Sequence, residues 1–239
     1  MVILKRTYGF LLAGAAPAAV IGLSAAPAFA ATTWTVSPGG AVMAKSGTTT
    51  LKDTTNGNFQ TCKSSSTSAT LKTGSGLQGT GLGSITALSF KTCTGPLGVT
   101  FTVTSNDLPW HLNAVSYDSS TGVTTGTITH IDATLSGPSC SADVDGTSAD
   151  SHTGKVKVHY TNSTGKLKVL TTGGNLHFYD VIGCGFLGGI NNGDAFTFNP
   201  TYTVTPKQTI TGSLARASQP GRAHRTARIR GERWPSVPP

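Results

Sequence analysis

Apolar and polar residues alternate one by one through much of this chain. The segments 99–104 (VTFTVT), 155–160 (KVKVHY) and 201–205 (TYTVT) show the alternation without interruption. Successive side chains of a β-strand point to opposite faces, so a period of two is typical of strands that bury one face. No stretch after residue 31 has the three- and four-residue apolar spacing of a long amphipathic helix. The pattern therefore predicts an all-β domain.

Short turn signals separate the predicted strands. Glycine adopts the positive φ angles that tight hairpins require, and it recurs in Asn56-Gly57, Thr121-Gly122, Thr153-Gly154, Thr164-Gly165 and Asn192-Gly193. Many short strands joined in this way favour a single antiparallel β-sandwich domain over residues 31–212. The alternative is an antiparallel β-barrel, which differs in that it can enclose a ligand.

Residues 1–30 have the features of a cleaved N-terminal signal peptide. Two basic residues precede an apolar run over residues 10–23, and Ala28-Phe29-Ala30 provides the small residues that signal peptidase requires. A retained membrane anchor is the alternative, but glycines and prolines interrupt the apolar run. We therefore expect a secreted, extracellular protein without a stable membrane anchor, whose mature chain begins at Ala31.

Four cysteines lie within the predicted domain: Cys62, Cys93, Cys140 and Cys184. An even number of cysteines in an exported chain indicates disulfides. Three pairings are possible, and we favour Cys62–Cys93 and Cys140–Cys184 because each pair joins sequence neighbours. The wide spacings lack the CxxC pair of a zinc site. We expect no metal and no cofactor.

The positive charge of the chain is concentrated at its two ends. The formal net charge is +8, yet residues 31–212 contain ten lysines, nine aspartates, no arginine and no glutamate. A nearly neutral body of this kind disfavours nucleic-acid binding. Residues 213–239 are rich in arginine and proline, which predicts a disordered tail. Out-of-frame translation explains this abrupt change best, and a basic arm for anionic wall polymer is the alternative.

His130 and Asp132 are two residues apart on a predicted strand, so we expect them to share a face within hydrogen-bonding reach. An aspartate that orients a histidine base can support a nucleophile, although no G-x-S-x-G motif is present. Asp143 and Asp145 resemble part of a calcium loop, but the glycine and terminal glutamate of that loop are missing, which favours a surface turn. We assign no catalytic residue and keep His130 and Asp132 as binding candidates.

Trp110 and His111 are the other binding candidates, because a tryptophan that follows a proline beside polar residues can stack on a sugar ring. The alternative is that Trp110 belongs to the core, as large aromatic residues usually do. We favour the core position for Trp110.

Several segments resemble a group of small secreted proteins of actinomycetes. They are residues 108–113 (LPWHLN), 160–167 (YTNSTGKL), 127–140, 183–184 and 202–211 (YTVTPKQTIT). The resemblance covers most of residues 32–212. The group has no known activity, so the resemblance implies export and a shared β fold, but no reaction and no site.

The expected function is that of a secreted, non-enzymatic binding or structural protein, with cell-wall or extracellular polymer as the partner considered. A secreted hydrolase that uses Asp and His residues is one alternative, and a small-ligand-binding β-barrel is the other. Convergence of His130 and Asp132 with a serine or aspartate in a cleft would favour the hydrolase. A closed barrel with an apolar cavity would favour the ligand-binding protein.

Overall fold

The computed structural model describes residues 32–187 and 189–214, which contain β-strands and two short 3-10 helices but no α-helix. The prediction of an all-β fold is confirmed. The predicted signal peptide (1–30) and residues 215–239 of the predicted tail (213–239) lie outside the described residues, whereas residues 213 and 214 belong to the last strand. Within them, no helix has the length and hydrophobicity needed to span a bilayer.

The elements, in chain order, are β1 (Thr32–Ser37), β2 (Gly40–Ser46), β3 (Thr49–Asp53), β4 (Phe59–Leu71), β5 (Gly74–Leu77), β6 (Gly83–Thr94), η1 (Pro96–Gly98), β7 (Thr100–Ser105), β8 (Trp110–Asp118), β9 (Val123–Ile131), β10 (Ala133–Gly137), β11 (Cys140–Asp145), β12 (Gly154–Thr161), β13 (Lys166–Val169), β14 (His177–Ile182), η2 (Cys184–Leu187), β15 (Phe196–Phe198), β16 (Thr201–Thr205) and β17 (Thr209–Leu214).

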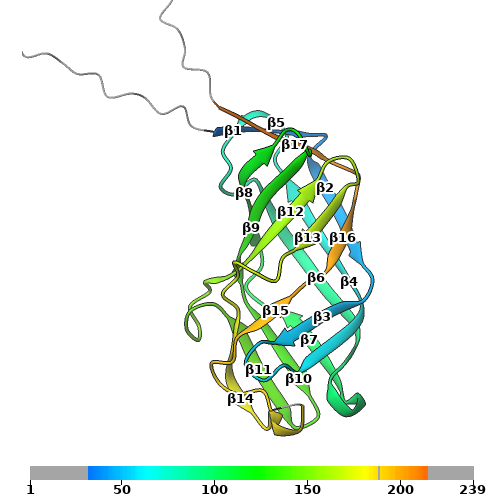
Figure 1. Cartoon of the computed structure of the whole chain (residues 1–239), viewed down its shortest axis with the longest axis vertical. Helices are drawn as coiled ribbons and strands as arrows, with labels where there is room; N and C mark the ends of the chain where they lie inside the picture. Colours follow the sequence, from blue (N-terminus) through cyan, green and yellow to red (C-terminus); the bar gives the residue numbers. More distant parts are fainter. Residues whose placement is uncertain (1–31, 188, 215–239) are drawn as a thin grey trace, which may run out of the picture.

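Antiparallel strands close into one elongated barrel (Figure 1). In the upper half, neighbours follow the order β6, β8, β9, β12, β13, β16, β2 and β4, and β4 pairs with β6 to complete the ring. The long strands β4 and β6 continue into the lower half, where β7, β10, β11, β14, β15 and β3 form the rest of the wall. There β14 and β15 meet through a bridge between His177 and Ala195.

Closure decides between the two predicted architectures. The antiparallel fold takes the form of a barrel rather than the sandwich that the sequence favoured, because β16 pairs with β2 and no free sheet edge remains between them. The alternation that predicts the strands is the same in both architectures. Val156, Val158 and Tyr160 of β12 point inward and are buried, whereas Lys157 and His159 between them point outward.

A small three-stranded sheet of β17, β1 and β5 covers the upper end of the barrel (Figure 1). Trp34 of β1 is buried beneath it, and a Cβ atom on Gly79 would collide with its ring. The cap is also hydrogen-bonded to the wall. The Tyr160 hydroxyl donates to the Gln208 carbonyl oxygen at 2.9 Å, and the Gly39 amide donates to Gln208 Oε1 at 2.8 Å.

Two disulfides join Cys62 to Cys93 and Cys140 to Cys184, which are the pairs favoured from the sequence. Cys62 and Cys93 lie directly opposite each other on β4 and β6 in the lower half. Cys140 opens β11 and Cys184 opens η2, so this bridge ties the lower end of the wall to the segment after β14. Two disulfides are compatible with an extracellular location.

Candidate ligand cavities and a polar surface pocket

Two neighbouring cavities lie inside the barrel, and we call them the upper cavity and the lower cavity. The upper cavity has a volume of about 90 Å³, and its wall includes Ala44, Ala69 and Gly126. The lower cavity has a volume of about 70 Å³, and its wall includes Phe90 and Phe198. Thr67, Ile85 and Leu167 line both cavities and therefore lie between them.

Small side chains explain why the upper half is not filled. An eight-stranded barrel has an interior just wide enough to be filled by side chains or to hold one small ligand. Ala44, Ala69 and Ala114 occupy inward positions where a leucine would reach the axis. Gly126 has no room for a side chain, because a Cβ atom would collide with the Asn113 carbonyl oxygen of β8.

The polar atoms in the wall of the upper cavity are bonded within the protein. The Thr67 hydroxyl donates to the Ala87 carbonyl oxygen at 2.8 Å, and the Thr124 hydroxyl donates to the Ile210 carbonyl oxygen at 3.1 Å. The Tyr160 hydroxyl donates to Gln208, as described above, and burial raises the pKa of Tyr160. These groups offer a ligand little polarity, so the surface of the upper cavity is apolar.

Tyr202 lines the lower cavity from β16. Burial raises the pKa of Tyr202 to about 12, although the hydrogen bond from Ser65 acts in the opposite direction. The Ser65 hydroxyl lies 3.0 Å from the Tyr202 hydroxyl. Tyr202 is therefore a neutral group at any physiological pH, which keeps the cavity free of charge.

The predicted binding residues Trp110 and His111 lie at the start of β8. Trp110 is 5% exposed and lines the lower cavity, and its Nε1 donates to the Asn106 carbonyl oxygen at 3.0 Å. It therefore belongs to the core and is not displayed on the surface for a sugar. The His111 ring packs on the His130 ring, with 4.6 Å between the ring centres.

His130 and Asp132 are not brought together, because the strand is irregular at His130. Lys155 lies opposite Thr129 and Gly154 lies opposite Ile131, so His130 is an extra residue without a partner and has a φ of +63°. Such a β-bulge breaks the period of two on which the expected shared face depends. Gly154 is not in a hairpin turn but opens β12, where a Cβ atom would collide with Ile131.

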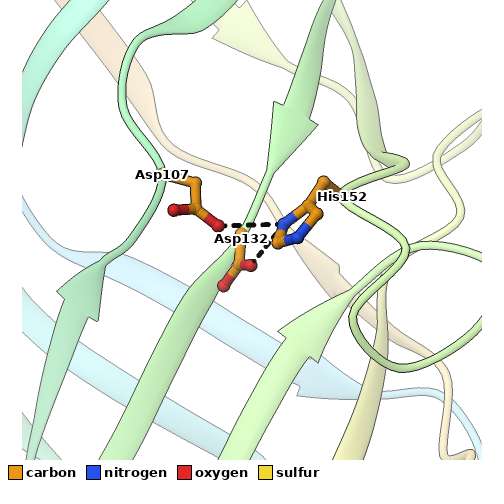
Figure 2. A group of neighbouring side chains, drawn as sticks. All are labelled: Asp107, Asp132 and His152. Carbon is orange, nitrogen blue, oxygen red and sulfur yellow. Dashed lines mark hydrogen bonds and ion pairs between the residues drawn. The ribbon is translucent and has the colours of Figure 1, made fainter.

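Asp132 instead contacts His152, a residue that the sequence analysis did not single out. Figure 2 shows that His152 faces both Asp107 and Asp132, and its Nδ1 lies 3.0 Å from Asp107 Oδ2 and 2.9 Å from Asp132 Oδ2. The three residues come from separate connections of the lower half: β7 to β8, β9 to β10, and β11 to β12. The other oxygen of Asp132 accepts a hydrogen bond from Asn106 Nδ2 at 3.0 Å.

The connection that carries His152 is held in place by the buried carboxylate of Asp145. Asp145 accepts hydrogen bonds from the backbone amides of Gly146, His152 and Thr153 and from the Ser151 hydroxyl. Burial acts to raise the pKa of Asp145, but these hydrogen bonds outweigh it and the pKa lies below its usual value. Asp145 thus serves as the anchor of a surface loop, which explains why the sequence around it resembles a calcium loop only in part.

A polar pocket of about 210 Å³ surrounds the Asp107–Asp132–His152 group, and its wall includes Asp143, Asp145 and Asp150. The wall of this pocket contains five carboxyl groups and no lysine, which favours ligands that are cationic or that donate hydrogen bonds. One donor atom each from Asp107, Asp132 and His152 lie within 4.8 Å of one another, so these three residues could hold a metal ion. In the described part of the chain, no hydroxyl group is hydrogen-bonded to His152 Nε2, so the group lacks the nucleophile of a hydrolytic triad.

The sequence around His152 does not predict its contact with Asp132. His152 is twenty residues from Asp132, and the two meet because β10 and β11 form a hairpin between them. The sequence feature that comes closest to indicating this site is the aspartate-rich segment 143–150 just before His152. Comparisons of the chain with protein-family models, with curated proteins and with solved structures found no match.

Proposed function

We propose that this protein is an extracellular binding protein that holds a small apolar molecule inside its barrel. The observation that carries the proposal is the pair of adjacent cavities in a closed, apolar interior. Of the three functions considered from the sequence, it is the small-ligand-binding barrel that predicts such an interior. The proposal retains the expected non-enzymatic role and places ligand binding inside the barrel.

The energetic cost of the cavities supports a functional role. Protein interiors are normally packed as densely as organic crystals. Unfilled volume lowers the free energy of unfolding by about 24 cal/mol per Å³, so each of these cavities costs roughly 2 kcal/mol of stability. Because a domain is stable by only about 5–15 kcal/mol, two such cavities cost a large share of the stability. A bound molecule that fills them would recover that loss.

The cavity walls indicate the chemistry of the ligand. Val42, Leu71, Val158 and Val204 surround the upper cavity, and no charged side chain lines either cavity among the described residues. Apolar contact of this kind stabilises a complex by about 25 cal/mol per Å² of buried surface, and an apolar wall disfavours a charged ligand. An apolar cavity of about 150 Å³ binds benzene, so a molecule the size of benzene or cyclohexane would need to extend across both cavities, whose volumes are about 90 and 70 Å³.

A matched pair of substitutions on β2 tests the proposal. Ala44 points into the upper cavity, whereas Ala41 on the same strand is exposed. We expect benzene or cyclohexane at 100 times its Kd to stabilise the wild type by about 2.7 kcal/mol, measured as a shift in thermal unfolding. Ala44→Leu should fill the upper cavity and weaken this shift, and Ala41→Leu should leave it unchanged. Failure of both compounds to shift the wild type would overturn the proposal.

A hydrolase that uses Asp and His residues is the second candidate. The observation that favours it is the placement of His152 Nδ1 against two carboxylates, which would leave Nε2 to act as a base. A panel of ester and polysaccharide substrates tests it, with His152→Ala and Asp132→Asn compared with His159→Ala on the wall. Hydrolysis that survives only in His159→Ala supports this candidate, and a panel without activity in the wild type overturns it.

A further inference from the structure

The lower half of the barrel contains polar side chains that are completely buried and have no hydrogen-bond partner. Of the buried side-chain atoms without a partner among the described residues, three belong to Thr49 and Gln60. They are the Thr49 hydroxyl oxygen and both amide atoms of Gln60, and both residues are 0% exposed. Buried polar groups are almost always hydrogen-bonded, so this pair requires an explanation.

Strand register places both side chains on the inner face of the wall, next to residues that line the lower cavity. Gln60 of β4 lies directly opposite Leu51 of β3, and Leu51 lies directly opposite Phe198 of β15. Side chains of directly opposed residues point to the same face of a sheet, and Leu51 and Phe198 both line the lower cavity. Thr49 is two residues from Leu51 on the same strand, so it shares this inner face.

The chemistry of the two groups indicates what they would bind. The Gln60 amide offers a donor and an acceptor, and the Thr49 hydroxyl offers both functions in one group. The nearest buried acid on the inner face of β3, Asp53, already accepts hydrogen bonds from the Thr55 and Asn56 amides. With no lysine or arginine buried among the described residues, an anionic group would find no counter-charge there.

We infer that the ligand is amphiphilic: an uncharged head group that both donates and accepts hydrogen bonds meets Gln60 and Thr49, while its apolar body occupies the lower cavity. This inference rests on the proposed function and adds polarity and orientation to it. A hydroxyl or a primary amide has the required hydrogen-bonding capacity. The upper cavity, whose polar wall atoms are bonded within the protein, would receive only apolar atoms.

The test compares cyclohexane with cyclohexanol, which differ by one hydroxyl group. The measured quantity is the ratio of their Kd values, obtained from NMR titrations of buried methyl groups. Gln60→Leu and Thr49→Val remove the hydrogen-bonding atoms at nearly constant volume. Thr50→Val is the matched control, because Thr50 is the next residue of β3 and points to the opposite face.

We expect both inner-face variants to lose roughly two- to tenfold of the relative affinity for cyclohexanol, with the Thr50→Val ratio unchanged. If both compounds bind but Gln60→Leu and Thr49→Val leave the ratio unchanged, the inference is wrong while the proposed function stands. If neither compound binds the wild type, the proposed function fails and the inference fails with it. Two independent inner-face variants keep the test decisive if one of them does not fold.

Discussion

The two halves of the barrel are closed in different ways. In the upper half, β16 pairs with β2 and the sheet of β17, β1 and β5 covers the end. In the lower half, the three-residue strand β15 meets β14 through a bridge between His177 and Ala195, and both disulfides lie here. The upper half relies on hydrogen-bonded strands, whereas the lower half adds covalent links.

The interiors of the two halves differ as well. Small apolar side chains and internally bonded polar atoms surround the upper cavity. Several aromatic residues, among them Phe90 and Phe198, line the lower cavity, and the lower half also contains the unpaired Gln60 and Thr49 and the loop held by Asp145. One barrel thus combines an apolar cavity with a second cavity close to unpaired polar side chains, because β4 and β6 run through both halves.

Removal of both disulfides should have the largest effect on stability, and the lower half should lose more of its protection than the upper half. Each bridge closes a long loop, with sequence separations of 31 and 44 residues, and contributes about 2–4 kcal/mol. We therefore expect a four-cysteine-to-alanine variant to lose about 4–8 kcal/mol in urea unfolding. Hydrogen exchange should show that β11, β14 and β15 lose protection before β9 and β12. Equal loss in both halves would contradict the division.

Trp34→Ala should have the next largest effect, this time on the upper half. Trp34 is 2% exposed under the cap, and loss of a buried tryptophan costs about 3–5 kcal/mol. Urea unfolding gives the magnitude, and hydrogen exchange should show early opening of β1 and β17. Thr35→Ala, on the exposed face of the same strand, is the control and should change the stability little. Early opening of β14 instead of β1 would show that the cap does not hold the upper half.

Tyr202 should make the barrel sensitive to alkali. Its pKa is about 12 in the folded protein and about 10 in the unfolded chain. The resulting stability is fully present below pH 10 and is lost as the pH rises from 10 to 12, by roughly 2–3 kcal/mol. Urea unfolding at pH 9 and pH 11.5 measures the change. Tyr202→Phe should reduce the pH dependence, and an unchanged slope would mean that Tyr202 is exposed.

Asp145 should make a smaller contribution, confined to acid. Its pKa in the folded protein lies below the usual 3.8, so its stabilising effect is present above pH 3.8 and is lost as the pH falls through the folded value. Hydrogen exchange of residues 146–153 should rise first as the pH is lowered. Asp145→Asn should open this loop already at pH 7, and Asp150→Asn, at an exposed neighbour, should not. A loop that stays closed in Asp145→Asn would overturn the assigned anchoring role.

The strands were largely predictable, and the exceptions have physical reasons. The predicted segment 201–205 coincides with β16, the segment 155–160 lies within β12, and the segment 99–104 overlaps β7 in all but its first residue. The interior of β4 was missed because residues 63–68 (KSSSTS) contain no apolar residue, although Ser65 and Thr67 are buried there. A strand that places serine and threonine on its inner face shows no hydrophobic period.

The candidate site was predictable only in fragments. The expected pair of His130 and Asp132 does not form, and Asp132 contacts His152 instead. The bulge at His130 depends on how β9 pairs with β12, and that pairing is a long-range property. The unpaired state of Gln60 is equally invisible in the sequence, because it depends on what the facing strands offer.

The sequence alone was sufficient to predict which residues of the alternating strands face inward, where most of the hairpins turn, and which cysteine pairs are favoured. These properties follow from local rules: the alternation of side chains along a strand, the backbone freedom of glycine, and sequence proximity. Three properties depend on the tertiary structure instead: the strands close into a barrel, cavities remain inside it, and His152 contacts Asp107 and Asp132. Closure depends on pairing between β16 and β2 across more than 150 residues, and cavity volume depends on every inward side chain together.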